Sequence, residues 1–256
     1  MYIYISFLGS FIATSIYCFN NDFSYIDESH SYDAKLTQYT EILPTVLFNS
    51  FVLVPLCSIP FSYILPQEFN IYYFLLTFML SYIMSDIFFY IAHRIMHIPL
   101  LYKWSHKQHH KYKLTVGIEA LYLHWFDLYF GNILPFYLPL LILKWDLISS
   151  CIWTIIIVSR SVYVHGTTKN DHLTHHKLFV YNYSNSYTDI LMNTYKKKED
   201  VYKEDDVIEL SNEEELSEDK EKIYREYDDF INDVQDQKIK NFIYGGFYKF
   251  LYNIIY

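Results

Sequence analysis

Histidines are the residues of this chain whose number and spacing most clearly indicate chemistry. The chain has eleven, and ten of them fall between residues 93 and 176, in three groups and two single positions. On a helix, residues three and four apart share a face, so each group can present two or three imidazoles in one direction. Because neutral imidazole is a common metal ligand, we expect all ten to bind metal. They are His93, His97, His106, His109, His110, His124, His165, His172, His175 and His176.

The number of candidate ligands exceeds what one ion takes. A tetrahedral zinc needs four, so two metal ions are the economical interpretation. The glutamate base of HExxH zinc proteases is missing, because Arg94 follows His93 and Lys107 follows His106. Hydrolysis is therefore disfavoured, and no catalytic residue separate from the metal ligands is assigned. An all-imidazole site with open positions suits iron and O2, although ligand type alone leaves zinc open.

Four aspartates stand near the histidine groups in the sequence. Metal-binding imidazoles usually donate their other N–H to a carboxylate or a carbonyl, and we expect these aspartates to accept such bonds. Two of the four, Asp127 and Asp171, could equally be ordinary surface acids, whereas the first lies in an apolar segment, where an unpaired charge is costly. They are Asp86, Asp127, Asp171 and Asp189.

The elements that carry the histidines are strongly apolar. The chain is 52% hydrophobic and 20% aromatic, and its apolar runs approach or reach the length that crosses a bilayer. The first run is interpreted as an uncleaved anchor, because neither basic residues at its start nor a small-residue cleavage site is obvious. Prolines interrupt the second, which membrane helices tolerate. The runs cover residues 1–19, 42–66, 71–92, 128–143 and 147–164.

The expected fold is all-α: a polytopic helical membrane protein of about four to five membrane segments with a cytosolic histidine-rich helical cap. The residues Lys144–Asp146 divide the last long apolar region into a helical hairpin. A hairpin returns the chain to the side that it left, so 92–127 and 165–195 face the same compartment. The first of these is rich in Lys and Arg, which favours the cytosol. The segment 20–41 is expected to be a polar loop on the same side.

Charge is concentrated near the C-terminus. Residues 196–240 hold 17 of the 29 acidic and 9 of the 20 basic side chains, and we interpret them as an acidic low-complexity insertion. Residues 241–256 form an aromatic tail suited to the membrane interface or to packing on the body. The remainder is divided into N-terminal membrane segments (1–80) and a histidine-rich di-metal oxygenase core that includes the hairpin (81–195). No net basic surface is predicted, which argues against binding to nucleic acid.

The motifs resemble those of the fatty acid hydroxylase/sterol desaturase superfamily, integral membrane enzymes with a histidine-bound di-iron centre. The resemblance covers about residues 81–195, and the order and spacing of the motifs agree throughout. Four departures are His165-Gly166 in place of His-Ser-Gly, the shortened connection from His165 to His172, Trp125 in place of a proline, and Thr188 in place of a tryptophan. The motifs that carry the resemblance are Asp86-x6-His93-Arg94-x2-His97, His106-x2-His109-His110, His124-x2-Asp127 and His172-x2-His175-His176.

The resemblance implies an O2-dependent oxidoreductase that hydroxylates or desaturates a lipid C–H bond, with two iron ions as cofactor, zinc being an alternative in purified protein. Similarity of 117–124, 179–183 and 194–195 to sterol enzymes points to a sterol, with a fatty acid or sphingolipid hydroxylase, or a silent metal-binding relative, as the alternative. It further implies the endoplasmic reticulum membrane, an active site facing the cytosol, and a b-type cytochrome or NAD(P)H-dependent reductase as electron donor. A metal transporter is disfavoured, because transport ligands lie within the bilayer.

Overall fold

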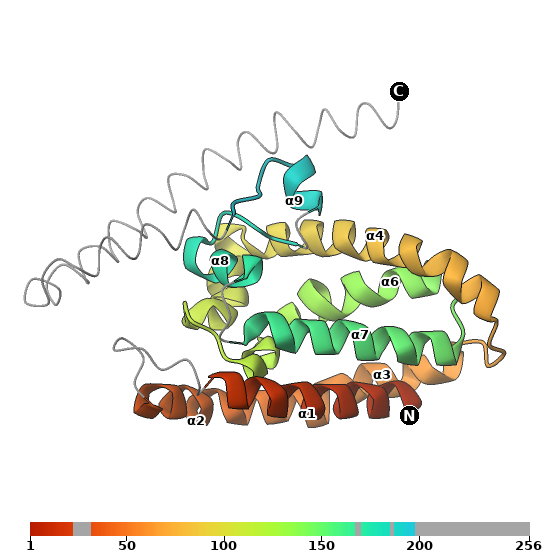
Figure 1. The fold of residues 1–256 in the computed structure, drawn as a ribbon, viewed down its shortest axis with the longest axis horizontal. Coiled ribbons are helices and arrows are strands. Elements are labelled where there is room, and N and C mark those ends of the chain that lie inside the picture. The colour runs from red at the N-terminus through yellow and green to blue at the C-terminus, as the bar shows by residue number, and fades with distance from the viewer. Residues whose placement is uncertain (23–31, 167–169, 185–186, 198–256) are drawn as a thin grey trace, which may run out of the picture.

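The computed structural model describes residues 1–22, 32–166, 170–184 and 187–197, so nearly all of the predicted insertion 196–240 and the whole tail 241–256 lie outside the described residues. Throughout these ranges the regular structure is helical (Figure 1). The α-helices are α1 (Tyr2–Asp22), α2 (Tyr32–Phe48), α3 (Val54–Ile64), α4 (Ile71–Met96), α5 (Pro99–Trp104), α6 (Leu134–Ile142), α7 (Leu147–His165), α8 (Asp171–Leu178) and α9 (Tyr187–Leu191). Two 3-10 helices, η2 (His106–Lys111) and η3 (Gly117–Leu121), and two π-helices, η1 (Asn49–Leu53) and η4 (Asp127–Ile133), complete them.

Four helical stretches are long and apolar enough to cross a membrane, and a fifth is shorter. The four are Tyr2–Asn20, Tyr32–Ile64, Ile71–Met96 and Leu147–His165, and the shorter one is Asp127–Ile142. Their outward faces expose large apolar side chains such as Leu76 and Met79, which a bilayer but not water would favour. The expected all-α polytopic membrane fold is confirmed.

The second membrane segment begins ten residues earlier than predicted, because α2 starts at Tyr32 and continues through η1 into α3. The expectation of a polar loop over 20–41 is therefore wrong for 32–41. Two polar side chains of this first part are buried against other segments: Lys35 donates to the Asp22 carbonyl, and Gln38 donates to Glu119 Oε2 at 2.9 Å. Tertiary partners thus allow polar residues to extend an apolar helix.

Both π-helices end two residues before a proline, Pro55 after η1 and Pro135 after η4. A proline cannot donate to the carbonyl four residues back, and its ring crowds that carbonyl. A widened π turn before it relieves this mismatch without ending the helix. The prolines therefore shape the membrane helices and do not break them.

The predicted hairpin turns where expected. Lys144 adopts a left-handed conformation with φ of 50°, and the Trp145 amide donates to the Leu140 carbonyl at 2.9 Å, which closes the C-terminal end of α6. The Asp146 side chain then accepts from the Ser149 amide at 2.9 Å and caps the start of α7. Helices α6 and α7 consequently run antiparallel, with α1 packed along α7 and α4 along α6.

The long helices lie side by side, and the short elements gather at one end of the bundle, where α8 lies beside the last turns of α4 and α7 (Figure 1). Helices α4 and α7 both finish at this end, at Met96 and His165. The 3-10 helices η2 and η3 also connect membrane segments here. The fold thus brings the end of each histidine-bearing helix to one place.

Candidate metal centre

Four short stretches of backbone deliver nine of the ten candidate histidines to the cap. His93 lies in the last turn of α4, and His97 is the residue that caps it. His165 is the last residue of α7. The side chain of Asn170 accepts from the Leu173 amide at 2.9 Å and starts α8. The remaining six candidates lie on η2 (His106, His109, His110) and on α8 (His172, His175, His176).

Nine of the ten predicted ligands converge in two groups. In each group the candidate ligand nitrogens all lie within 4.8 Å of one another. Every ring is buried except that of His172, which is partly exposed. The first group is His93, His97, His106, His110 and His175, and the second is His109, His165, His172 and His176. The structure thus presents two adjacent clusters of nitrogen donors, which matches the number of metal ions inferred from the ligand count.

Hydrogen bonds fix which nitrogen of the first group points inward. The Nδ1–H of His93 donates to the Tyr183 carbonyl at 2.7 Å, that of His106 to Asp127 Oδ2 at 2.7 Å, and that of His175 to the Tyr181 carbonyl at 2.6 Å. Oxygen acceptors of this kind place the proton on Nδ1. In the neutral form, the Nε2 of each of these three rings therefore carries a lone pair.

These lone pairs face one another at short range. The Nε2 atoms of His93 and His106 lie 3.1 Å apart, and those of His106 and His110 lie 3.0 Å apart. In the neutral form, His93 and His106 have no proton to share between them, so this contact is repulsive unless a cation lies between the rings. The arrangement of these nitrogen atoms therefore fits a metal ion. This observation does not depend on the sequence motif.

The second group shows the same arrangement. The Nδ1–H of His165 donates to the Ser161 carbonyl at 2.6 Å, and its Nε2 lies 2.9 Å from that of His172 and 3.3 Å from that of His109. Both ring nitrogens of His176 are buried without a hydrogen-bond partner. A buried imidazole without partners is costly, and coordination of a metal would satisfy one of its nitrogens.

Burial keeps the rings neutral, as metal binding requires. It lowers the pKa of His175 to about 3. It also lowers the pKa values of His97, His109, His110 and His176 well below their usual range, and the neighbouring imidazoles lower them further. At neutral pH the lone pairs are therefore available without displacing protons.

The four predicted aspartates take different positions. Asp127 directly accepts from His106, as expected. Asp189 and Asp86 lie further out: Asp189 accepts from the Tyr183 amide at 2.8 Å, and Asp86 accepts from the Thr188 hydroxyl at 2.5 Å. They hold the loop whose Tyr183 carbonyl orients His93. Asp171 begins α8, and its backbone carbonyl accepts from Asn182 at 3.2 Å.

His124 does not join either histidine group. Its Nδ1 accepts from the Phe126 amide at 3.4 Å, and its ring packs against Trp104 with the ring centroids 5.0 Å apart. The reason lies in the backbone before it, where Asn49 donates to the carbonyls of Leu121 and Leu123 at 2.8 Å. These two bonds tie the segment to η1 and hold it outside the cluster.

Sequence reasoning missed the carbonyls of Ser161, Tyr181 and Tyr183 as ring acceptors. Left-handed residues shape the loop that carries two of them, with φ of 58° at Phe179 and 55° at Asn182. Asparagine tolerates this conformation, so Asn182 is a weak sequence signal. A backbone acceptor has no side-chain signature, and only the three-dimensional fold identifies it.

A cavity of about 250 Å³ opens beside the histidines. Members of both groups line it, together with Asp127, Phe89 and Phe136. Its position would let a substrate carbon approach both groups, while aromatic side chains cover one side. The arrangement can hold two metal ions next to a partly apolar chamber.

Comparisons with known proteins agree with this geometry. Residues 78–194 match the family model Fatty acid hydroxylase. The chain is 30% identical over 121 residues to Fatty acid hydroxylase ahd1 of Mycosarcoma maydis, covering 43% of this chain and 31% of that protein. It is 33% identical over 129 residues to Delta(7)-sterol 5(6)-desaturase of Candida glabrata, covering 45% and 35%.

A third relative is Methylsterol monooxygenase 1 of Rattus norvegicus, 28% identical over 172 residues, covering 57% of this chain and 58% of that protein. The aligned regions thus span from under a third to just over half the length of these three relatives. No solved structure matches the chain significantly. The family match spans all ten predicted ligand histidines, so the predicted resemblance to the fatty acid hydroxylase/sterol desaturase superfamily is confirmed over residues 78–194.

Proposed function

We propose that this membrane protein is a di-iron oxygenase that oxidises an unactivated C–H bond of a lipid. The observation that carries the proposal is the convergence of nine histidines, eight of them buried, in two groups whose lone pairs point inward. Two divalent cations would relieve that repulsion. The first group, with five rings, and the second, with four, would hold one ion each.

Bound iron would supply O2 activation, the step that no amino-acid side chain performs. The chain's own residues would bind the metal ions and orient the histidine rings. Asp127 and the carbonyls of Ser161, Tyr181 and Tyr183 fix the rings of His106, His165, His175 and His93. Phe89 and Phe136, stacked with centroids 4.9 Å apart, line the neighbouring chamber and limit access of water.

The overall reaction requires electrons from outside the chain. Hydroxylation consumes one O2, two electrons and two protons, and releases one water besides the alcohol. Desaturation consumes the same and releases two waters besides the alkene. We propose a b-type cytochrome or an NAD(P)H-dependent reductase as the donor. The lysines of the cap (Lys103, Lys107, Lys111 and Lys113) support a cytosolic face, and we propose the endoplasmic reticulum as the membrane.

We propose a sterol as the substrate. The support is that several relatives are sterol enzymes by name, a methylsterol monooxygenase and sterol 5(6)-desaturases among them. A fatty acid or sphingolipid is the competing substrate, favoured by the similarity to a fatty acid hydroxylase. Lipid profiling of cells that lack the gene separates the two, because the accumulating precursor is either a sterol or an acyl lipid.

Metal analysis of the purified full-length protein tests the centre itself. We expect two irons per chain in wild type and fewer than two in His175→Ala, whose ring contacts two others of the first group through Nε2. His124→Ala is the matched control, since that ring lies outside both groups. One weakly held zinc per chain, or equal loss in the control, would contradict the proposal. Two irons without turnover on any lipid would indicate a silent metal-binding relative.

A further inference from the structure

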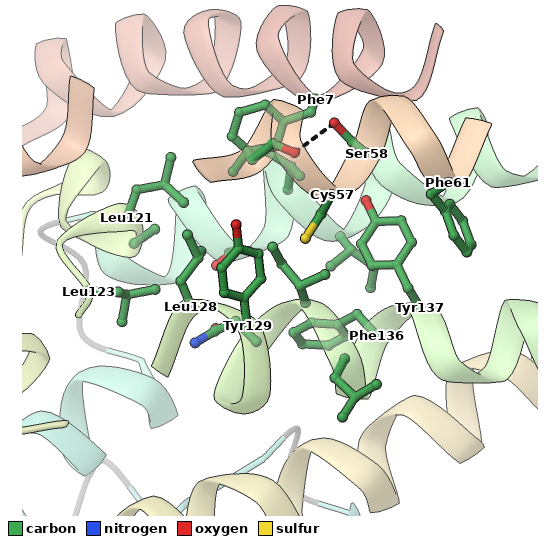
Figure 2. A pocket seen from close by; sticks show the side chains of 18 of the residues that line it. Phe7, Cys57, Ser58, Phe61, Leu121, Leu123, Leu128, Tyr129, Phe136 and Tyr137 are labelled. Atoms are coloured by element: carbon green, nitrogen blue, oxygen red, sulfur yellow. Dashed lines mark hydrogen bonds between the residues drawn. The ribbon is translucent and has the colours of Figure 1, made fainter. Parts of the chain in front are cut away.

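A second cavity, of about 370 Å³, lies deeper in the bundle between α1, α3, the η4–α6 segment and α7. Figure 2 shows Cys57 of α3 facing Tyr129, Phe136 and Tyr137 from the opposite side of this space. None of the side chains that line it is charged. The metal centre does not account for this cavity, which is the larger of the two.

Three polar side chains in the wall already have hydrogen-bond partners. The Tyr129 hydroxyl donates to the Leu53 carbonyl at 2.9 Å, and the Ser58 hydroxyl donates to the Val54 carbonyl at 2.8 Å (Figure 2). The Tyr137 hydroxyl bonds to that of Thr154 at 2.8 Å. An apolar guest can therefore enter with these three hydrogen bonds intact, whereas a charged guest would find no charged side chain in the wall.

The volume suits an organic guest. An apolar protein cavity of about 150 Å³ stays dry and binds benzene, and small-molecule sites begin at roughly 300 Å³. At about 370 Å³ this cavity exceeds both values. An empty space of this size within membrane helices would forfeit packing energy, which favours occupation by part of a lipid.

Four residues line both this cavity and the one beside the histidines, so the two adjoin across them. They form two pairs with i, i+4 spacing on antiparallel segments, Asn132 and Phe136 on η4–α6 and Ile157 and Ser161 on α7. Asn132 and Ser161 are the members nearer to the histidine end of each segment. The shared wall is therefore polar next to the metal centre and apolar one turn deeper.

The shared wall also contacts histidines of the metal centre. The Ser161 carbonyl accepts from His165 Nδ1 at 2.6 Å. Phe136 stacks on Phe89, which lies against His93 with the ring centroids 5.2 Å apart. A guest that displaces Phe136 or Ile157 thus reaches the space beside both histidine groups.

We propose that the 370 Å³ cavity holds the uncharged apolar body of the lipid substrate, and that Phe136 and Ile157 form a partition that sets which carbon reaches the metal centre. This inference rests on the proposed function. In this arrangement the carbon to be oxidised lies beyond the partition in the histidine-lined cavity. Side-chain size at Phe136 and Ile157 then determines substrate position, while the other lining residues determine affinity.

Photo-crosslinking tests occupancy without requiring turnover. Full-length protein in lipid nanodiscs is exposed to a diazirine-bearing sterol or, separately, a diazirine-bearing fatty acid, and labelled peptides are mapped by mass spectrometry. We expect label on the wall of the deep cavity, around residues 54–61 and 128–141. Cys57→Trp fills the space and should reduce this labelling about tenfold or more. Leu56→Trp is the control, because Leu56 is 64% exposed on the same helix and does not line the cavity.

The outcomes separate the two proposals. Unchanged labelling in Cys57→Trp, with two irons still bound, would refute occupancy of the cavity even if the enzyme is active. Labelling that the tryptophan abolishes, in a protein without turnover, would support the lipid cavity and contradict the oxygenase. The probe that labels the wall distinguishes a sterol from an acyl chain.

A second variant tests the partition. Ile157→Phe should leave metal content unchanged, and should lower turnover about tenfold or shift the oxidised position along the lipid. Val158→Phe, on the next residue of the same helix, lines the deep cavity only, so it should reduce labelling without changing the oxidised position. An unchanged rate and product in Ile157→Phe would refute the role of the partition.

Discussion

Replacement of Asp127 by asparagine should change stability in opposite directions with and without metal. Asp127 is 1% exposed, its Oδ2 accepts from His106 Nδ1 at 2.7 Å, and its Oδ1 is buried without a hydrogen-bond partner. A buried carboxylate with one partner is costly. A cation on the other side of the His106 ring would compensate that charge. Asparagine has nearly the same shape and lacks the charge. The substitution therefore separates the cost of burying the charge from the stabilisation that the charge gives to a cation.

The magnitudes follow from the role of this bond. Loss of a carboxylate partner of a metal-bound histidine typically costs about 10- to 100-fold in metal affinity, which is about 1.4 to 2.8 kcal/mol. Without metal, the variant no longer buries an uncompensated charge, and we expect it to be more stable than wild type by about 1 kcal/mol. A stability change of opposite sign with and without metal would identify electrostatic stabilisation of a bound cation by the Asp127 carboxylate.

Thermal unfolding of iron-loaded and metal-free protein in nanodiscs measures the change in stability. Metal competition titrations measure the change in metal affinity. Asp146→Asn is the control: Asp146 is also buried, but it caps α7 at the far end of the hairpin, where asparagine caps equally well. That variant should bind metal as wild type does. Destabilisation of Asp127→Asn by the same amount with and without metal would refute the reasoning, because it would indicate a purely structural bond.

Three further predictions concern the same centre. Gly131→Ala should lower metal affinity as Asp127→Asn does, because a Cβ there would lie 2.2 Å from Asp127 Oδ1; metal titration checks this, and wild-type affinity would contradict it. His110→Ala should lose iron while His124→Ala retains it, as measured by metal content per chain. Metal-free protein should lose stability as pH falls below about 6.5, by up to about 1.4 kcal/mol per pH unit for each buried ring such as His175. The sign follows because burial lowers the folded-state pKa, to about 3 for His175, so only the unfolded chain takes up protons in that window; a pH series of unfolding temperatures measures it.

The groups of histidines were predictable because short-range spacing determines them. Pairs such as His93 and His97 lie one helical turn apart, so their common direction follows from helix geometry alone. The hairpin turn was predictable for a similar reason, since Lys144–Asp146 interrupts a long apolar run and Asp146 is a favourable N-cap. Local signals of this kind can be interpreted from the sequence without knowledge of the tertiary structure.

Two features depended on long-range contacts and could not be predicted. The helical start of α2 relies on the bond between Gln38 and Glu119, which lie 81 residues apart in the sequence. The position of His124 relies on the bonds from Asn49 to Leu121 and Leu123, which no spacing rule anticipates. The sequence correctly indicated residue types with metal-binding chemistry, and the tertiary contacts determine which of them meet.

The place of the histidines at helix ends has a physical reason beyond access to the lipid. Two divalent cations bound by neutral imidazoles would bring four positive charges to a buried site, and Asp127 places a carboxylate against the His106 ring. The C-terminal end of a helix carries a partial charge of about −0.5, and both α4 and α7 end here, with His97 as the cap of one and His165 as the last residue of the other. These two helix ends supply negative potential without adding anionic ligands that would occupy open positions. The same histidines placed in mid-helix would lack that compensation, which explains why the groups stand at the ends of membrane segments.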